Sequence, residues 1–219
     1  MPRFDVVLLD LDGTLLNTRR DLVASTNHVR ATFGLPPLDA HAVERLVGHG
    51  ARVLVERALG AERARVHEEG VSRFIEHYEE HCLDHTRPYA GMAGLVDSLS
   101  AQGVRFAVIT NKPERLSRKI LAGLGLVDRM VAVIGGDTFP KRKPHPGGVW
   151  RVLECCAADR SRALMVGDSA VDVETARAAG IVMCGVMWGF DPESLRATGL
   201  ELLAADAAEL GRIILEGSG

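Results

Sequence analysis

Short apolar runs alternate with amphipathic stretches along most of this chain. The runs are rich in Val, Ile and Leu and have no polar face, which is typical of strands buried on both sides. The expected strands are residues 6–9, 104–109, 130–134, 163–166, 182–186 and a last one near 200–203. Between them apolar residues recur at helical spacing, and the expected helices are residues 92–101, 113–124, 146–156, 170–179 and 205–214. This alternation predicts an α/β fold, a doubly wound parallel sheet with helices on both faces and the first strand at its centre.

The stretch between the first strand and residue 88 has a different pattern, with helical signals and no strand signal. Its expected helices are residues 20–33, a segment from the N-cap Asp39 to residue 47, residues 51–59, and one longer helix from 63 to about 85. We therefore predict an α/β core of residues 1–15 and 88–219 and an inserted all-helical cap of residues 16–87. The hinges between them are expected near residues 16–19 and 86–90.

Two carboxylates, Asp10 and Asp12, come directly after the first apolar run, in the sequence DLDGTL. Two ionised side chains this close repel each other and are costly to desolvate. A bound cation explains such a pair, and so does a reaction that needs a nucleophile beside an acid. Gly13 lets the backbone turn there, so that N–H groups can face an anion. Asp-Gly pairs also form plain turns after strands, which leaves a structural interpretation open for this motif alone.

Further polar residues follow other expected strands. Thr110 and Asn111 come after the second strand, and Asp168 comes after the fourth, with Asp172 one helical turn later. Lys143 lies in the loop KRKPHP after the third strand. Because open α/β sheets build their sites at the carboxyl ends of their strands, we expect these groups to meet. Each also has a plainer interpretation: the threonine as a cap of the next helix, the lysine as a solvated charge, the last aspartate as a helix-terminal acid.

The order of carboxylate pair, threonine, lysine and second carboxylate pair resembles the four motifs of the haloacid dehalogenase superfamily, across essentially the whole chain. The resemblance implies that Asp10 is a nucleophile that forms an aspartyl phosphate and that Asp12 is the general acid and base. The dehalogenase branch does not use the second aspartate in this way, so its presence favours phosphate chemistry. Thr110 and Lys143 would bind the oxygens of the transferred phosphoryl group.

The resemblance also implies a Mg²⁺ cofactor, since attack of a carboxylate on an anionic phosphate needs added positive charge. The expected ligands are the side chains of Asp10 and Asp168 and the backbone carbonyl of Asp12, with Asp172 holding a metal-bound water. Backbone N–H groups of Gly13 and Asn111 are expected to help bind the phosphoryl group.

The predicted cap would set the choice of substrate. Its sequence RLVGHGARVLVERAL, residues 45–59, resembles the cap of bacterial phosphoglycolate phosphatases. A two-carbon substrate carries a carboxylate, so we expect Arg45, His49 or the amides around Gly50 to face it, with Arg52 as a further candidate. An arginine on a helix is more often a solvated surface residue, and this interpretation stays open for both arginines.

Composition narrows the class of protein further. The chain has 219 residues, of which 47% are hydrophobic and 25% charged, with a formal net charge of −3. A slightly negative chain without a basic run gives no electrostatic case for a nucleic-acid or membrane-surface partner. The longest apolar runs are too short to cross a bilayer, and no signal-peptide pattern is visible. The four cysteines show neither a CxxC pair nor a zinc spacing, so we expect reduced thiols and a cytoplasmic location.

We therefore expect a Mg²⁺-dependent phosphomonoesterase that hydrolyses 2-phosphoglycolate, a small phosphorylated metabolite, as a monomer or homodimer. Alternatives with the same first step are a phosphatase of another sugar phosphate or amino-sugar phosphate and a phosphosugar mutase. A phosphonate hydrolase would need a lysine in the cap, where the sequence has none. A non-catalytic phosphate sensor on the same fold is an alternative of another class, although binding alone would not need Asp12.

Overall fold

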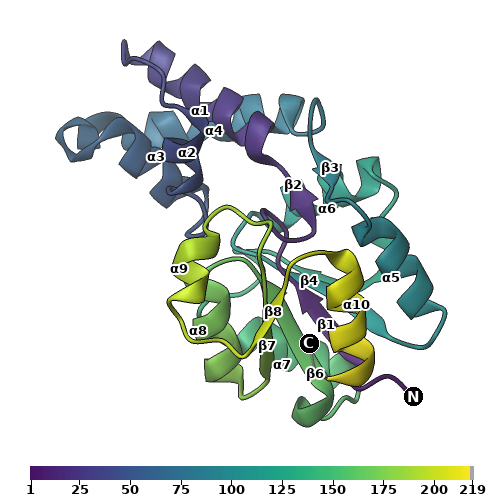
Figure 1. The fold of residues 1–219 in the computed structure, drawn as a ribbon. Coiled ribbons are helices and arrows are strands. Elements are labelled where there is room, and N and C mark those ends of the chain that lie inside the picture. Colours follow the sequence, from purple (N-terminus) through teal and green to yellow (C-terminus); the bar gives the residue numbers. More distant parts are fainter. Residues whose placement is uncertain (218–219) are drawn as a thin grey trace.

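A parallel sheet forms the centre of the computed structural model, which describes residues 1–217 apart from the side chain of Ser194 (Figure 1). The last two residues of the predicted core, 218 and 219, lie outside the described residues. Neighbouring strands run parallel in the order β5-β4-β1-β6-β7-β8. Their bounds are β1 Val6–Leu9, β4 Arg105–Ile109, β5 Met130–Ile134, β6 Ala163–Gly167, β7 Val182–Val186 and β8 Leu202–Ala204. The first strand lies between β4 and β6, as the sequence predicts for the central strand.

Helices cover both faces of the sheet, and alternate residues of β1 contact the two layers. Val7 and Leu9 belong to one apolar cluster, and Val6 and Leu8 belong to the other. The covering helices are α5 Met92–Ser100, α6 Glu114–Gly123, α7 Gly147–Cys155, α8 Ala170–Ala179 and α10 Ala207–Glu216. The short helix α9 Pro192–Arg196 and the 3₁₀ helices Val127–Arg129 and Arg160–Arg162 add to the predicted set. The predicted α/β fold with a doubly wound parallel sheet is confirmed.

A separate group of helices lies beyond one end of the sheet, and we name residues 19–81 the helical insertion (Figure 1). Its elements are α1 Arg19–Thr32, α2 Ala40–Glu44, α3 Ala51–Leu59, a 3₁₀ helix Ala61–Val66 and α4 His67–His81. Asp39 caps α2 as predicted, accepting a hydrogen bond from the N–H of Ala42, but α2 ends before residue 47. The long helix predicted from residue 63 to about 85 is present as α4, but it begins at His67 and ends at His81, and residues 63–66 belong to the 3₁₀ helix. The 3₁₀ helix buries none of its residues, so no apolar face holds it in a continuous α-helix with α4.

The chain enters and leaves the helical insertion side by side. The two-residue strands β2 Leu16–Asn17 and β3 Arg87–Pro88 pair antiparallel, although no strand was predicted at either place. Two residues are too few to show a strand period. The buried carboxylate of Asp21 accepts hydrogen bonds from the backbone N–H groups of His85 and Thr86 and from the Thr86 hydroxyl. This carboxylate therefore joins the first helix of the insertion to the segment by which the chain leaves it.

Replacing Asp21 by alanine is expected to lower the free energy of unfolding by about 1–3 kcal/mol, because it leaves buried donors without an acceptor. Urea unfolding measures the change. Asp84→Ala, which removes an exposed carboxylate bound to His81, serves as the control and is expected to change little. Equal effects of the two substitutions would contradict the role given to Asp21.

No helix among residues 1–217 is both long enough and apolar enough to pass through a lipid bilayer.

Candidate active site

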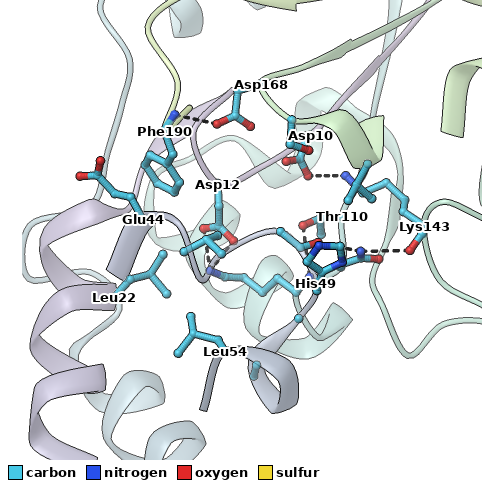
Figure 2. A pocket seen from close by; sticks show the side chains of 18 of the residues that line it. Asp10, Asp12, Leu22, Glu44, His49, Leu54, Thr110, Lys143, Asp168 and Phe190 are labelled. Carbon is cyan, nitrogen blue, oxygen red and sulfur yellow. Dashed lines mark hydrogen bonds and ion pairs between the residues drawn. The ribbon is translucent and has the colours of Figure 1, made fainter. Parts of the chain in front are cut away.

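The polar groups expected at the strand ends do meet. Asp10 follows β1, Thr110 follows β4 and Asp168 follows β6, and all three side chains are buried. Lys143 reaches them from the loop between β5 and α7 (Figure 2). The parallel register of the strands brings these residues to the same edge of the sheet, although they are far apart in the sequence.

Lys143 is the cation at the centre of this group. Its Nζ atom donates to Asp10 Oδ1 at 2.7 Å and to Asp172 Oδ1 at 2.6 Å. Burial opposes its charged form, but Asp10 and Asp172 outweigh it and raise the pKa of Lys143. Because its side chain is only 4% exposed, the interpretation of Lys143 as a solvated charge is wrong.

Asp172 combines two structural tasks. Its Oδ2 atom accepts hydrogen bonds from the backbone N–H and the hydroxyl of Ser169, which completes a capping box at the start of α8. Its other oxygen binds Lys143. The helix-terminal interpretation of Asp172 is therefore correct, and the contact with the lysine adds a function in positioning that cation. The predicted water-holding role of Asp172 stays a prediction.

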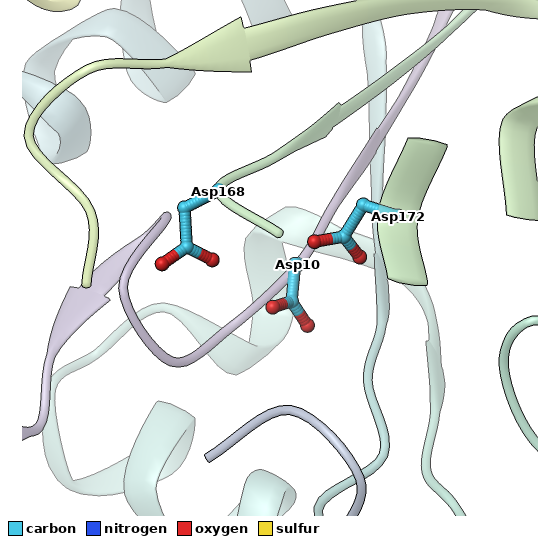
Figure 3. A group of neighbouring side chains, drawn as sticks. All are labelled: Asp10, Asp168 and Asp172. Atoms are coloured by element: carbon cyan, nitrogen blue, oxygen red, sulfur yellow. The ribbon is translucent and has the colours of Figure 1, made fainter. Parts of the chain in front are cut away.

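Three buried carboxylates could hold a cation. One oxygen from each of Asp10, Asp168 and Asp172 lies within 4.8 Å of the others (Figure 3). Burial raises the pKa of Asp10 to about 7, with Lys143 opposing the shift and Asp172 adding to it. Burial also raises the pKa of Asp168 well above its usual value. Buried carboxylates are costly to ionise without a cation beside them. A divalent cation such as Mg²⁺, which prefers oxygen ligands, would stabilise their charged forms.

Two glycines allow the backbone to approach Asp168 closely. Gly13 has a φ of +83°, and a Cβ atom added there would lie 2.2 Å from Asp168 Oδ2. A Cβ added at Gly189 would lie 2.2 Å from the Cβ of Asp168. The backbone N–H of Phe190 donates to Asp168 Oδ2 at 2.8 Å and fixes the carboxylate (Figure 2). Larger residues at the two glycine positions would clash with Asp168 and displace it.

Asp12 is held by three donated hydrogen bonds. The Thr18 hydroxyl donates to Oδ1 at 2.6 Å, and the Lys112 ammonium donates to Oδ1 at 2.7 Å and Oδ2 at 2.8 Å. Lys112 also donates to the hydroxyl of Tyr78 at 3.0 Å. No role was predicted for Lys112. Its position directly after Thr110 and Asn111, in a loop at the end of a strand, was the signal that could have found it.

A cavity of about 240 Å³ lies between the strand ends and the helical insertion. Its polar side carries Asp10, Asp12 and Lys143, and much of the remaining lining is apolar (Figure 2). The main apolar side chains that line it are Leu22, Leu54, Phe74, Leu116 and Phe190. This apolar wall was not predictable from the sequence, because its residues come from separate elements.

The candidate substrate residues of the insertion divide into two groups. Arg45, His49 and Gly50 line the cavity. The side chain of Arg45 has no hydrogen-bond or ion-pair partner among residues 1–217, so its guanidinium is available to a ligand. Burial lowers the pKa of His49, and Arg57 and Arg142 lower it further, which favours the neutral imidazole. Arg52 lies outside the cavity lining and pairs with Glu68 on the surface.

Asn111 connects the core to the insertion. Its side-chain amide donates to the backbone carbonyls of Gly48 at 2.8 Å and Lys143 at 3.2 Å. Its Oδ1 atom is buried without a partner among residues 1–217. The hydroxyl of Thr110 accepts from the N–H of Lys112 at 3.2 Å, whereas the N-cap of α6 is Pro113. The interpretation of Thr110 as a helix cap is therefore wrong, and its hydroxyl lies at the cavity.

Comparison with known proteins agrees with this arrangement. Residues 7–186 match the family of haloacid dehalogenase-like hydrolases. The phosphoglycolate phosphatase of Rhodospirillum rubrum is 39% identical over 96% of this chain and 90% of its own. The N-acetylmuramic acid 6-phosphate phosphatase of Pseudomonas aeruginosa is 35% identical over 86% of this chain and 84% of its own. The crystal structure of a predicted phosphoglycolate phosphatase from Haemophilus somnus superposes with a TM-score of 0.91 at 29% identity, covering 97% of this chain and 99% of that one. The motif order, the family match and these similarities agree: the chain belongs to the haloacid dehalogenase-like hydrolases.

Proposed function

We propose that this chain is a cytoplasmic, Mg²⁺-dependent phosphatase that hydrolyses 2-phosphoglycolate to glycolate and phosphate through an aspartyl phosphate. Within its family it is a phosphoric monoester hydrolase. The observation that carries the proposal is the cavity itself, which has Asp10 and Lys143 on one side and the unpartnered Arg45 on the side of the insertion. A phosphate with a short acidic tail fits charges placed in this way.

The metal would be held by the side chains of Asp10 and Asp168 and the backbone carbonyl of Asp12. When bound, Mg²⁺ supplies the positive charge that offsets the repulsion between a carboxylate and a phosphate. Asp172 keeps Lys143 at the site, and Lys143 with Thr110 binds the phosphoryl oxygens.

The chain's own groups then carry out two displacements. A carboxylate oxygen of Asp10 bonds to phosphorus while the ester oxygen leaves with a proton from Asp12. Asp12, now a carboxylate, takes a proton from the water that attacks the aspartyl phosphate. The second displacement releases phosphate and restores both aspartates. Thr18 and Lys112 hold Asp12 beside the cavity for both proton transfers.

Residues 16–87 would form the cap domain that covers this site. The cavity lies between these residues and the strand ends, and the paired strands β2 and β3 lie at both predicted hinges. The Asn111–Gly48 hydrogen bond would hold the cap loop closed over the substrate. The choice of substrate then depends on which cap groups face the cavity, chiefly Arg45 and the apolar wall.

An amino-sugar phosphate is the second candidate substrate, and the apolar wall favours it. Leu54, Phe74 and Leu116 offer a surface for an acetyl group or an ether side chain, which 2-phosphoglycolate lacks. The similarity to a phosphatase of N-acetylmuramic acid 6-phosphate supports this alternative. Both candidates share the chemistry of Asp10 and Asp12 and differ only in what contacts the cap.

Steady-state phosphate release from a panel of substrates tests the proposal. The panel contains 2-phosphoglycolate, N-acetylmuramic acid 6-phosphate, simple sugar phosphates and nucleotides, each measured with Mg²⁺ and with EDTA. We expect the highest kcat/KM for 2-phosphoglycolate and no turnover in EDTA. A preference for the amino sugar would replace the first candidate by the second. Turnover unchanged in EDTA would contradict the metal requirement, and binding without turnover would establish a sensor.

Mg²⁺ is expected to raise the melting temperature of the protein, because it stabilises the charged forms of buried carboxylates in the folded state only. Differential scanning fluorimetry measures the shift without relying on activity. The shift is expected to vanish in Asp168→Asn and to persist in Asp5→Asn, whose carboxylate pairs with Arg162 away from the site. An unchanged Mg²⁺ shift in Asp168→Asn would contradict the assigned ligand.

Replacing Arg45 by methionine is expected to lower kcat/KM for 2-phosphoglycolate by about tenfold or more, because a charge-assisted hydrogen bond to the substrate carboxylate is lost. With p-nitrophenyl phosphate, which has no carboxylate, the same variant is expected to keep near-normal kcat/KM. Arg52→Met is the matched control, since Arg52 lies in α3, outside the cavity lining, and pairs with Glu68 on the surface. Equal losses on both substrates would contradict the assignment of Arg45.

A further inference from the structure

Lys112 lies between the helical insertion and Asp12, the residue proposed as general acid and base. Its ammonium makes three hydrogen bonds, two to the oxygens of Asp12 and one to the hydroxyl of Tyr78. Asp12 belongs to the strand-end loop of the core, and Tyr78 belongs to α4 of the insertion. The Lys112 side chain is only 5% exposed, so water does not readily replace these partners. All three donors of the ammonium are therefore used by groups on the two sides of the cavity.

Tyr78 is well placed to fix this cation. It is fully buried, its ring stacks on Phe74, and its hydroxyl accepts from Lys112. The Lys112 ammonium also lies 4.5 Å from the centre of the Tyr78 ring, within the range of a cation–π interaction. Displacement of α4 from the core would remove both contacts at once. The lysine would then have only Asp12 to hold it.

We propose that Lys112 is a positioning residue for Asp12 and that Tyr78 makes this positioning depend on the seating of the helical insertion. The Thr18 hydroxyl anchors one oxygen of Asp12, whereas Lys112 bridges both. With Tyr78 in place, Lys112 keeps the carboxylate plane turned toward the ester oxygen that must receive a proton. Proton transfer is thus coupled to closure of the cavity over the substrate. The inference rests on the acid–base role proposed for Asp12.

A comparison of two similar phosphate esters distinguishes a specific effect on proton donation by Asp12 from a general loss of activity. Phenolate is a much stronger base than p-nitrophenolate, so phenyl phosphate needs proton donation as its bond breaks and p-nitrophenyl phosphate hardly does. The two substrates have nearly the same shape and would make nearly the same contacts with the helical insertion. Their kcat/KM values report the first phosphoryl transfer, before the aspartyl phosphate is hydrolysed.

Lys112→Met is expected to lower kcat/KM for phenyl phosphate by about tenfold or more and to change kcat/KM for p-nitrophenyl phosphate by about twofold at most. Tyr78→Phe keeps the ring and its packing, and the same selective loss is expected at smaller size. Combining the two substitutions is expected to be no worse than Lys112→Met alone, because both act through one bond. Tyr89→Phe is the matched control, since its buried hydroxyl has no partner among residues 1–217.

The outcomes distinguish this inference from the proposed function. Asp12→Asn is measured beside the other variants and is expected to show the strongest selectivity. If Asp12→Asn lowers kcat/KM equally for both esters, the acid role of Asp12 is wrong, and the inference is wrong with it. Asp12→Asn can instead lower kcat/KM for phenyl phosphate alone, while Lys112→Met and Tyr78→Phe lower kcat/KM equally for both esters or not at all. That result would overturn the positioning role of Lys112 alone. Thermal melts identify a Lys112 variant that does not fold, and Tyr78→Phe then decides the question.

Discussion

Asp10→Asn is expected to lower kcat by roughly 10⁴-fold or more while the protein stays folded, because an amide cannot serve as the nucleophile. The side chain lies at the floor of the cavity, and its contact with Lys143 places it against the phosphate. The amide keeps an oxygen that can accept from the lysine, so the buried ammonium is not left without partners. Asp172 still binds the same cation.

Activity and folding of this variant are measured together, by phosphate release at saturating substrate and by circular dichroism melts. Asp5→Asn is the matched control, because Asp5 lies just before β1 and binds Arg162 instead of the site. It is expected to keep near-normal kcat. Activity of Asp10→Asn within about tenfold of the normal value would contradict the assignment of the nucleophile.

The second large effect is expected in Asp12→Asn, with a loss of about 10²–10⁴-fold in kcat for 2-phosphoglycolate. The alkoxide of glycolate is a poor leaving group without a proton, and water is a poor nucleophile without a base. Both proton transfers are assigned to the carboxylate that Thr18 and Lys112 hold. The asparagine keeps the size and one acceptor oxygen of the original side chain, so the loss reports lost proton transfer.

Rapid-quench kinetics separate the two steps in this variant. Formation of the aspartyl phosphate from p-nitrophenyl phosphate is expected to be nearly unaffected, whereas its hydrolysis is expected to be slow, so phosphorylated protein should accumulate. Asp137→Asn, which removes a surface carboxylate that accepts from the N–H of Glu114, is the control. Normal turnover of 2-phosphoglycolate by Asp12→Asn would show that another group moves the protons.

The core and its convergent motifs were predictable because their signals are local. Runs such as Val6–Leu9 are buried on both faces, so they appear in the sequence as unbroken apolar segments. Parallel strands must then bring the residues that follow them, Asp10 and Asp168 among them, to one edge of the sheet. All six core strands and the five main core helices agree with the structure to within two residues at each end.

The parts that were not predictable depend on tertiary contacts. Residues 61–66 have ordinary helix-forming composition, and only their lack of burial shows why they form a 3₁₀ helix. The apolar wall of the cavity combines side chains such as Leu22, Phe74 and Leu116 from three helices. Tyr78 has the spacing of an ordinary core aromatic, and its bond to Lys112 links residues 34 positions apart. No periodicity along the chain records such a contact.

The stereochemical course at phosphorus tests the central claim most directly. A 2-phosphoglycolate made chiral at phosphorus with sulfur and oxygen isotopes is hydrolysed in isotope-labelled water, and the configuration of the released thiophosphate is determined. Transfer to Asp10 and then to water consists of two in-line displacements, each of which inverts phosphorus, so the account predicts net retention. Net inversion would show that water attacks the substrate directly, and the nucleophilic role of Asp10 would be wrong.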